Sequence, residues 1–216
     1  MLAFTFPDFA VTVEEEKKQA ADPKAAEEVK SELNEIIGLS EVKDYVLSLE
    51  QNYIIQRLRE ARGMKADVPT MHMIFTGNPG TGKTTIARLV SRYLKAMGVL
   101  SGGQLIEVTR ADLVGKYVGH TAPLTQQVIR SALGGVLFID EAYSLYRGAD
   151  DSFGLEAIDT IVKGMEDHRE DLIVILAGYT KEMEEFLTAN SGLRSRFPNI
   201  IEFPDYTFRE LLAITK

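Results

Sequence analysis

The most informative segment of the chain is GNPGTGKT, at residues 77–84. It fits G-x-x-x-x-G-K-S/T, the pattern of a loop that binds phosphate groups between a strand and a helix. The flanking sequence agrees with this pattern. A mostly apolar run at 71–75 predicts a buried strand, and the apolar spacing at 86–94 predicts an amphipathic helix.

The residue types of this loop suit a bound nucleotide. Gly80 and Gly82 allow the backbone to come close to phosphate oxygens, and consecutive N–H groups at a helix N-terminus attract anions. The Lys83 ammonium would reach the β- and γ-phosphates, and the Thr84 hydroxyl would bind Mg²⁺. The other loop residues that we expect to contact the nucleotide are Asn78, Pro79, Thr81 and Thr85.

A second segment, GGVLFIDE at residues 134–141, supplies carboxylates. Its apolar run predicts a buried parallel strand, so Asp140 falls at the carboxyl end, where open α/β sheets place their ligands. Asp140 would hold Mg²⁺, partly through water, and Glu141 would polarise a water molecule against the γ-phosphate. Taken separately, the segments could be a tight strand–helix turn and a helix cap. Both together, in this order, favour a nucleotide hydrolase.

The composition suits one α/β domain with a hydrophobic core. Of 216 residues, 45% are hydrophobic and 26% are charged. The absence of cysteine excludes disulfides and thiolate metal sites, and the three histidines show no metal-ligand spacing. No apolar run approaches the ~18 residues that span a bilayer, and the first residues lack the basic region of a signal peptide. We therefore expect a cytoplasmic protein with no membrane contact.

The charge balance disfavours nucleic acid as a partner. Acidic residues outnumber basic ones by 32 to 24, the net charge is −8 and the sequence pI is about 5.0. A nucleic-acid-binding protein usually needs a basic face that neutralises phosphates. Protein partners fit this sequence better.

Strand and helix patterns alternate along the chain. This alternation predicts right-handed crossovers and a parallel sheet between two helical layers, the three-layer αβα arrangement. Besides the elements at the two motifs, we expect strands at 105–108, 172–177 and 200–203, and helices at 124–132, 153–166 and 180–187.

Residues 1–35 form an acidic N-terminal extension. Asp22 as N-cap and Pro23 at the first helical position predict the start of a helix in it, which we expect to be solvated because of its many charges. The role of residues 1–13 stays open between an edge strand, a docking arm and the remnant of a longer chain.

Residues 36–206 form the nucleotide-binding part of the chain. Its first helix begins at Ser40, which we expect to cap it. The capping box Thr207–Glu210 then starts a last helix within residues 207–216. Because the chain stops inside this helix, we expect a truncated protein.

Four motifs, in this order, resemble those of the AAA+ ATPases: GNPGTGKT, GGVLFIDEAYSL, ILAGY at 175–179 and GLRSRF at 192–197. They are most similar to the branch that contains stage V sporulation protein K, the red-type rubisco activase CbbX and the ATPase of mycobacterial type VII secretion. The resemblance covers about residues 33–216. It implies the large α/β subdomain of a P-loop NTPase, with the helical lid absent or truncated. It also implies ATP or ADP with Mg²⁺ as cofactors, and a ring of identical subunits, a hexamer when the protein is complete.

The resemblance also assigns residues outside the two main motifs. Ile37 and Gly38 would pack on adenine, although an ordinary approach to the next helix is an alternative. Arg196 is the first candidate and Arg194 the second for an arginine finger that enters the neighbouring subunit's active site and neutralises γ-phosphate charge. We expect the other arginine to be structural and paired with a carboxylate.

Two further assignments follow from the same resemblance. Tyr179 and Thr180 stand where these proteins carry their first sensor, and a hydroxyl there could orient the attacking water. The segment Lys116-Tyr117-Val118 resembles a pore loop that grips an extended polypeptide, with a buried tyrosine between two turns as the alternative.

The predicted function is that of an ATP-driven ring that remodels or threads a protein client. A nucleic-acid-directed motor or loader would use the same ATP site, but the acidic composition disfavours it. A scaffold that binds nucleotide without turnover is the third possibility, and the Asp140–Glu141 pair argues against it.

Overall fold

The structure of the protein, a computed structural model, describes residues 21–63 and 70–215, so the question about residues 1–13 lies outside it. Within the described residues, five parallel strands form a sheet in the order β2-β3-β4-β1-β5. The strands are β1 (Met73–Gly77), β2 (Leu105–Val108), β3 (Gly135–Ile139), β4 (Leu172–Gly178) and β5 (Asn199–Phe203). All five lie where the sequence predicts them, within two residues.

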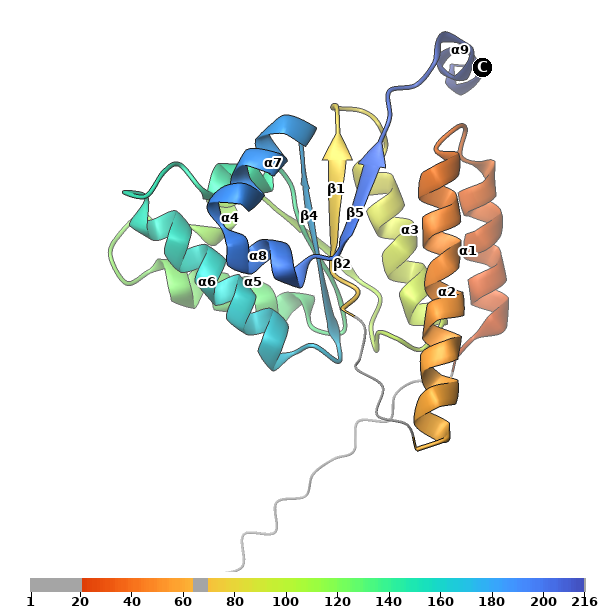
Figure 1. Ribbon diagram of the computed structural model, residues 1–216, viewed down its shortest axis with the longest axis horizontal. Coiled ribbons are helices and arrows are strands. Elements are labelled where there is room, and N and C mark those ends of the chain that lie inside the picture. Colours follow the sequence, from red (N-terminus) through yellow and green to blue (C-terminus); the bar gives the residue numbers. More distant parts are fainter. Residues whose placement is uncertain (1–20, 64–69, 216) are drawn as a thin grey trace, which may run out of the picture.

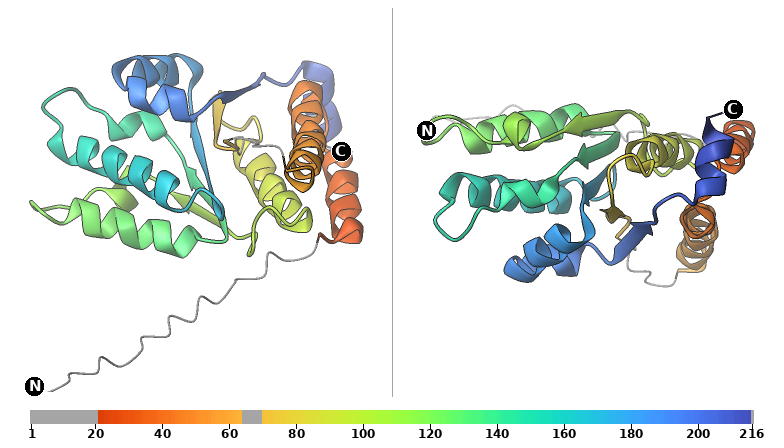
Figure 2. Two further views of the ribbon diagram at one scale, coloured as in Figure 1. Left: turned by 60° about the horizontal axis from the view of Figure 1, so that its bottom comes forward. Right: turned by 90° about the horizontal axis from the view of Figure 1, so that it is seen from above.

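Helices cover both faces of this sheet, as Figures 1 and 2 show. One layer consists of α1 (Pro23–Glu35), α2 (Ser40–Ala61) and α3 (Lys83–Ala96). The other contains α4 (Arg110–Leu113), α5 (Thr121–Ala132), α6 (Ser152–Asp167), α7 (Thr180–Ala189) and α8 (Ser191–Arg196). The last helix, α9 (Phe208–Ile214), lies at the end of the first layer, beside the connection between α1 and α2. The predicted three-layer αβα fold with a parallel sheet is therefore confirmed.

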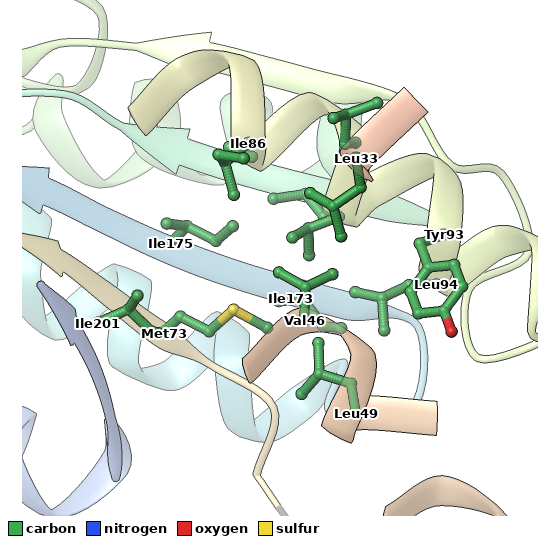
Figure 3. Packing of buried hydrophobic residues seen from close by; sticks show 14 of the residues in the cluster. Leu33, Val46, Leu49, Met73, Ile86, Tyr93, Leu94, Ile173, Ile175 and Ile201 are labelled. Atoms are coloured by element: carbon green, nitrogen blue, oxygen red, sulfur yellow. The ribbon is translucent and has the colours of Figure 1, made fainter. Parts of the chain in front are cut away.

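The three central strands, β1, β3 and β4, send their side chains alternately into two cores. In β1, Met73 and Phe75 join the core under α1–α3, whereas Ile74 joins the core under the other layer. Because both faces of these strands are covered, they are fully buried and almost entirely apolar, whereas the edge strands β2 and β5 are partly exposed. Figure 3 shows the first core, in which Val46 of α2 lies near Met73 and Ile173 of the sheet and Leu33 of α1 lies beside α3.

The helix α1 is packed more tightly than the sequence suggests. Asp22 caps it as predicted, since its Oδ1 accepts from the N–H groups of the second and third helical residues at 3.1 Å. Ala26, Val29 and Leu33 are buried against the first core, so the expectation of a solvated helix is wrong for this face. Their 3- and 4-residue spacing is that of an amphipathic helix, and the surrounding charges masked it.

A carboxylate ties the three helices of this layer together. Glu50 of α2 accepts from Lys30 Nζ of α1 at 2.8 Å and from the Tyr93 hydroxyl of α3 at 2.8 Å. The helix α1 therefore belongs to the same folding unit as α2 and α3.

Three short elements are absent from the predicted helices. The helix α4 and the 3₁₀ turn η1 (Ala142–Leu145) are each four residues long and α8 is six, which is too short for a periodic pattern. Ser40 is the first residue of α2 rather than its cap, because the preceding Leu39 has a left-handed φ of 54° and its carbonyl already accepts the first helical bond.

The last helix begins as predicted. The Thr207 N–H donates to Glu210 Oε2 at 2.7 Å, which is half of the capping box. The large apolar side chains of α9 are exposed: Phe208, Leu211, Leu212 and Ile214. None of the helices in residues 21–63 and 70–215 combines the length and apolar character that crossing a membrane requires.

Candidate active site

The phosphate-binding loop connects the end of β1 to the start of α3. Gly82 has a φ of 94°, a left-handed conformation that side chains avoid, directly before Lys83. A Cβ on Gly77 would lie 2.4 Å from the last carbonyl oxygen of β5, so a glycine is required there too. The Thr81 hydroxyl donates to the Asn78 carbonyl at 2.8 Å and closes the loop. The loop is therefore held in shape by its own bonds.

The Lys83 ammonium lies at the centre of this loop. Its Nζ donates to the carbonyl oxygens of Gly77 at 2.8 Å and Asn78 at 2.7 Å. Burial lowers the pKa of Lys83, and the negative charge of Asp140 works against that shift. A cation so placed, with Asp140 near it, is available to phosphate oxygens.

The acidic pair follows β3 on the same edge of the sheet. The Asp140 N–H donates to the Val108 carbonyl of β2 at 2.8 Å, and the Glu141 N–H donates to Asp140 Oδ1 at 2.9 Å. Glu141 is exposed and has a φ of 47°, one of two positive values among the described non-glycine residues. Such strain is typical of functional positions.

A cleft of about 310 Å³ brings the two motifs together. It opens at the carboxyl ends of β1, β3 and β4, where the chain order of the sheet reverses. Its lining residues are Pro79, Gly80, Gly82, Lys83, Thr84, Thr85, Asp140, Glu141, Gly178 and Tyr179. The Thr84 hydroxyl and the Asp140 carboxylate are hard oxygen ligands, so they fit Mg²⁺ that keeps several waters and binds phosphate.

The fourth strand contributes an aromatic wall to the cleft. Tyr179 lines it, whereas Thr180, the first residue of α7, does not. Tyr143 of η1 stacks on Tyr179, with ring centroids 5.6 Å apart and planes 29° apart. Burial, and secondly the charge of Glu141, raises the pKa of Tyr143 to about 12. Sequence reasoning missed Tyr143, although it stands only three residues after Asp140.

The residues predicted to contact adenine lie beside the loop, outside the cleft lining. A Cβ on Gly38 would approach Glu210 Oε1 to 2.6 Å, and one on Gly82 would lie 3.3 Å from the Tyr206 hydroxyl and 3.6 Å from Leu39. The segment with Ile37 and Gly38 is thus packed between the phosphate-binding loop and the start of α9. Tyr206 was not predicted, and no motif in the sequence points to it.

Two of the predicted loop contacts have bonds within the protein. The Asn78 amide donates to both carboxylate oxygens of Asp205 at 2.9 Å, and the Tyr206 hydroxyl donates to the Thr81 carbonyl at 3.4 Å. Neither Asn78 nor Thr81 lines the cleft. Both shape the loop from behind.

The two candidate finger arginines lie on α8, away from the cleft lining. Arg196 donates through Nε to Glu166 Oε1 of α6 at 3.1 Å, with a second bond from Nη2, and through Nη1 to the Gly192 carbonyl at 2.9 Å. Arg194 is exposed and makes no ion pair with a described residue. We expected one of these two arginines to pair with a carboxylate, and in the structure it is Arg196 that does so.

The candidate pore loop lies between α4 and α5. Tyr117 is 69% exposed and Val118 87% exposed, and Lys116 is exposed as well, which excludes the alternative of a buried tyrosine. The Tyr117 ring meets that of His120 edge-on, with centroids 5.5 Å apart. The loop presents an aromatic and an aliphatic side chain to solvent.

A sheet of this order with these two motifs defines the P-loop αβα fold. Residues 73–205 match the family model of the ATPase family associated with various cellular activities (AAA). The chain belongs to this family, as the motifs predict.

Curated relatives place the chain in the predicted branch. It is 48% identical over 200 residues to stage V sporulation protein K of Bacillus subtilis, and this match covers 93% of this chain and 62% of that protein. It is 50% identical over 191 residues to protein CbbX of Cereibacter sphaeroides, covering 88% and 62%. It is also 50% identical to a chloroplastic ribulose bisphosphate carboxylase/oxygenase activase of Cyanidioschyzon merolae, covering 84% and 62%. The chain thus spans about three fifths of the length of these relatives.

A solved structure supports the fold. The AAA domain of FIGL-1, crystallised in complex with ADP, superposes with a TM-score of 0.59 at 21% identity. The match covers 84% of this chain and 58% of that one.

Proposed function

We propose that the chain binds ATP with Mg²⁺ in the cleft between β1 and β3 and hydrolyses the terminal phosphate. The observation that carries this proposal is the shared lining of the cleft, in which Lys83 and Thr84 face Asp140 and Glu141. The same combination of a phosphate-binding loop and an acidic strand end serves phosphoryl transfer in P-loop NTPases. Membership of an ATPase family supports the proposal, and the ADP bound to FIGL-1 is consistent with it.

Each residue of the cleft has a distinct role in this proposal. The loop N–H groups and Lys83 hold phosphate oxygens, while Thr84 and Asp140 hold Mg²⁺, which would neutralise phosphate charge. Glu141 orients and polarises the attacking water, because its side chain is exposed at the cleft wall. The stacked Tyr143–Tyr179 pair limits the space in which that water can lie.

We further propose that the complete protein works as a ring on a protein client. The exposed Tyr117 and Val118 would grip an extended polypeptide through apolar contact. An arginine of α8 would complete the neighbouring cleft, and the ion pair of Arg196 with Glu166 favours Arg194 for this role. The net charge of −8 favours a protein over a nucleic acid as the client.

Calorimetry of the chain with Mg-ATP and Mg-ADP tests nucleotide binding directly. We expect heat of binding from the unaltered chain and none from Lys83→Ala, because the substitution removes the ammonium at the centre of the loop. Lys95→Ala, on the same helix but outside the cleft lining, is the matched control and should bind normally. Equal affinities for the unaltered chain and Lys83→Ala would contradict the proposal.

A further inference from the structure

A second polar cluster lies behind the active site. Arg110, the first residue of α4, donates through Nη1 to the carbonyl oxygens of Ser144 at 2.9 Å and Leu145 at 3.0 Å, both in η1. Its Nη1 and Nη2 also pair with the two carboxylate oxygens of Asp151, at 2.7 and 3.0 Å. The side chains of this ion pair are only 16% and 13% exposed. The Arg110 guanidinium therefore holds the cluster together, because it donates hydrogen bonds to every one of these acceptors.

The start of α6 completes the cluster. Asp151 caps α6, because its Oδ1 also accepts from the Gly154 N–H at 3.1 Å. A Cβ on Gly154 would lie 1.9 Å from the Leu145 carbonyl oxygen and 2.8 Å from Arg110 Nη1. A glycine is therefore needed for the helix to approach η1, and the guanidinium joins α4, η1 and α6.

The cluster connects η1, which follows the acidic pair, to α4, which precedes the candidate pore loop. The turn η1 begins directly after Glu141, and α4 ends directly before the loop at 114–120. One backbone bond, from Asp140 N to Val108 O at 2.8 Å, already joins the same two segments at the sheet. With the Arg110 bonds they are joined at two points, so a shift of the acidic pair cannot leave α4 in place without breaking one of them.

We propose that Arg110 is a positioning residue that couples the Asp140–Glu141 end of β3 to the loop at residues 114–120. Through it, nucleotide in the cleft changes the position of Tyr117 and Val118. The inference rests on the proposed function, because it requires nucleotide in the cleft. Coupling of this kind needs a contiguous contact between the two sites and a difference between their states, and the cluster supplies the contact.

The planar guanidinium is essential to this role. It satisfies two backbone carbonyls and a carboxylate at once, which the single point charge of a lysine cannot do with the same geometry. Arg110→Lys keeps the positive charge but cannot make all the hydrogen bonds of the guanidinium. A loss of coupling in this variant would therefore be due to the lost bonds and not to a lost charge. Asp151→Asn keeps an oxygen for the Gly154 N–H but removes the carboxylate that orients the arginine.

A probe on the loop tests the inference. The chain contains no cysteine, so Val118→Cys can carry a single maleimide dye. Its fluorescence anisotropy is measured without nucleotide, with Mg-ADP and with Mg-ATP, and the affinity is measured by calorimetry. We expect nucleotide to change the anisotropy in this background. In Arg110→Lys and Asp151→Asn the change should fall by about fivefold or more, while the Kd for nucleotide stays within about twofold.

Arg92→Lys is the matched control. Arg92 forms a similar fork with Glu32, at 2.6 and 2.7 Å, which joins α3 to α1 and does not contact η1 or the loop. The anisotropy change on nucleotide binding in Arg92→Lys should equal that of the parent, the labelled Val118→Cys chain. Circular dichroism checks that each variant is folded. If Arg110→Lys does not fold, the anisotropy change in Asp151→Asn alone tests the role of Arg110.

The possible results separate the two proposals. If the parent binds no nucleotide, the proposed function fails and this inference fails with it. If the parent binds nucleotide but the Val118→Cys probe never responds, the proposed function stands and the coupling is wrong. An undiminished response in Arg110→Lys and Asp151→Asn, or an equal loss in Arg92→Lys, also overturns the role of Arg110.

Discussion

Glu141 shows how a single backbone conformation can serve a site. Its left-handed φ of 47° costs of the order of 1–3 kcal/mol for a residue that is not glycine. The conformation persists because the amide donates to Asp140 and because Asp140 is itself bonded to Val108. The turn leaves the exposed Glu141 side chain at the cleft wall, which is the position that its proposed role as a base requires.

Replacement of Glu141 by glutamine should separate binding from turnover. Glutamine preserves the size of the side chain but cannot accept a proton, so we expect a loss of about 10²-fold or more in phosphate release. Binding of Mg-ATP measured by calorimetry should remain. Glu182→Gln, on the exposed surface of α7, serves as the control. A normal rate of phosphate release would exclude Glu141 as the base.

His72 is a second residue with a demanding environment. It is buried, and its ring lies against that of Phe197, with the ring centroids 5.7 Å apart. Its Nδ1 accepts a hydrogen bond from the Val174 N–H at 3.0 Å. Protonation of Nδ1 would destroy that bond. Burial lowers the pKa of His72 to about 4. These contacts are those of a packing residue.

This lowered pKa predicts that the protein loses stability in mild acid. Between pH 6.5 and about 4 the unfolded chain binds a proton at His72 that the folded chain does not, so stability falls as pH falls. We expect a loss of roughly 2 kcal/mol in the free energy of unfolding between pH 7 and pH 5. Urea unfolding at the two pH values measures it. His72→Gln, which keeps an acceptor, should lose less, and an equal loss in both chains would contradict the prediction.

At the scale of elements, α1 is the clearest case of tertiary structure overriding local composition. The exposed surface of this helix is largely charged or polar, yet its narrow apolar stripe is buried against α3. Arg92 of α3 and Glu32 of α1 also form an exposed ion pair at 2.6 Å, and water screens such a surface pair strongly. Burial of the stripe therefore dominates its attachment.

Truncation of the stripe should destabilise the whole protein. Leu33 is 1% exposed, so Leu33→Ala should lower the free energy of unfolding by about 2–5 kcal/mol. Ser31→Ala, on the exposed face of the same helix, should change it by less than about 0.5 kcal/mol. Urea denaturation of both variants makes the comparison. Similar small effects would show that α1 is only loosely attached.

At the scale of the whole molecule, the cleft has no arginine of α8 among its lining residues. Neither Arg194 nor Arg196 lines it, so the proposed finger would have to come from a second copy of the chain. An arginine finger contributes about 10³–10⁵ in rate in related hydrolases. If a neighbour supplies it, turnover depends on assembly.

Turnover per subunit should therefore rise with protein concentration. Arg194→Ala should lower turnover by about 10³-fold without loss of nucleotide affinity, whereas Arg196→Ala should act mainly through the loss of its bond to Glu166. Mixtures of Arg194→Ala with Glu141→Gln should recover activity, because each subunit supplies the half-site that the other lacks. Turnover that is independent of concentration, with no recovery in any mixture, would exclude a finger in trans.

Much of the fold and the centre of the site could be predicted from the sequence. The strands at Leu105–Val108 and Gly135–Ile139 lie where their apolar runs predict them. The phosphate-binding loop and Asp140–Glu141 are also local features, because each is specified by residues adjacent in the chain. The strand order does not follow from these local features, because β1 and β2 are consecutive in the chain but lie three positions apart in the sheet.

Only the tertiary structure decided which distant side chains meet. Tyr143 stacks on Tyr179 across 36 residues, and Arg110 meets Asp151 across 41. These contacts need β2, β3 and β4 to lie side by side, and they leave no periodic or motif pattern in the sequence. The residues that shape and connect the site are therefore set by packing, while local sequence sets the residues that we propose to bind phosphate.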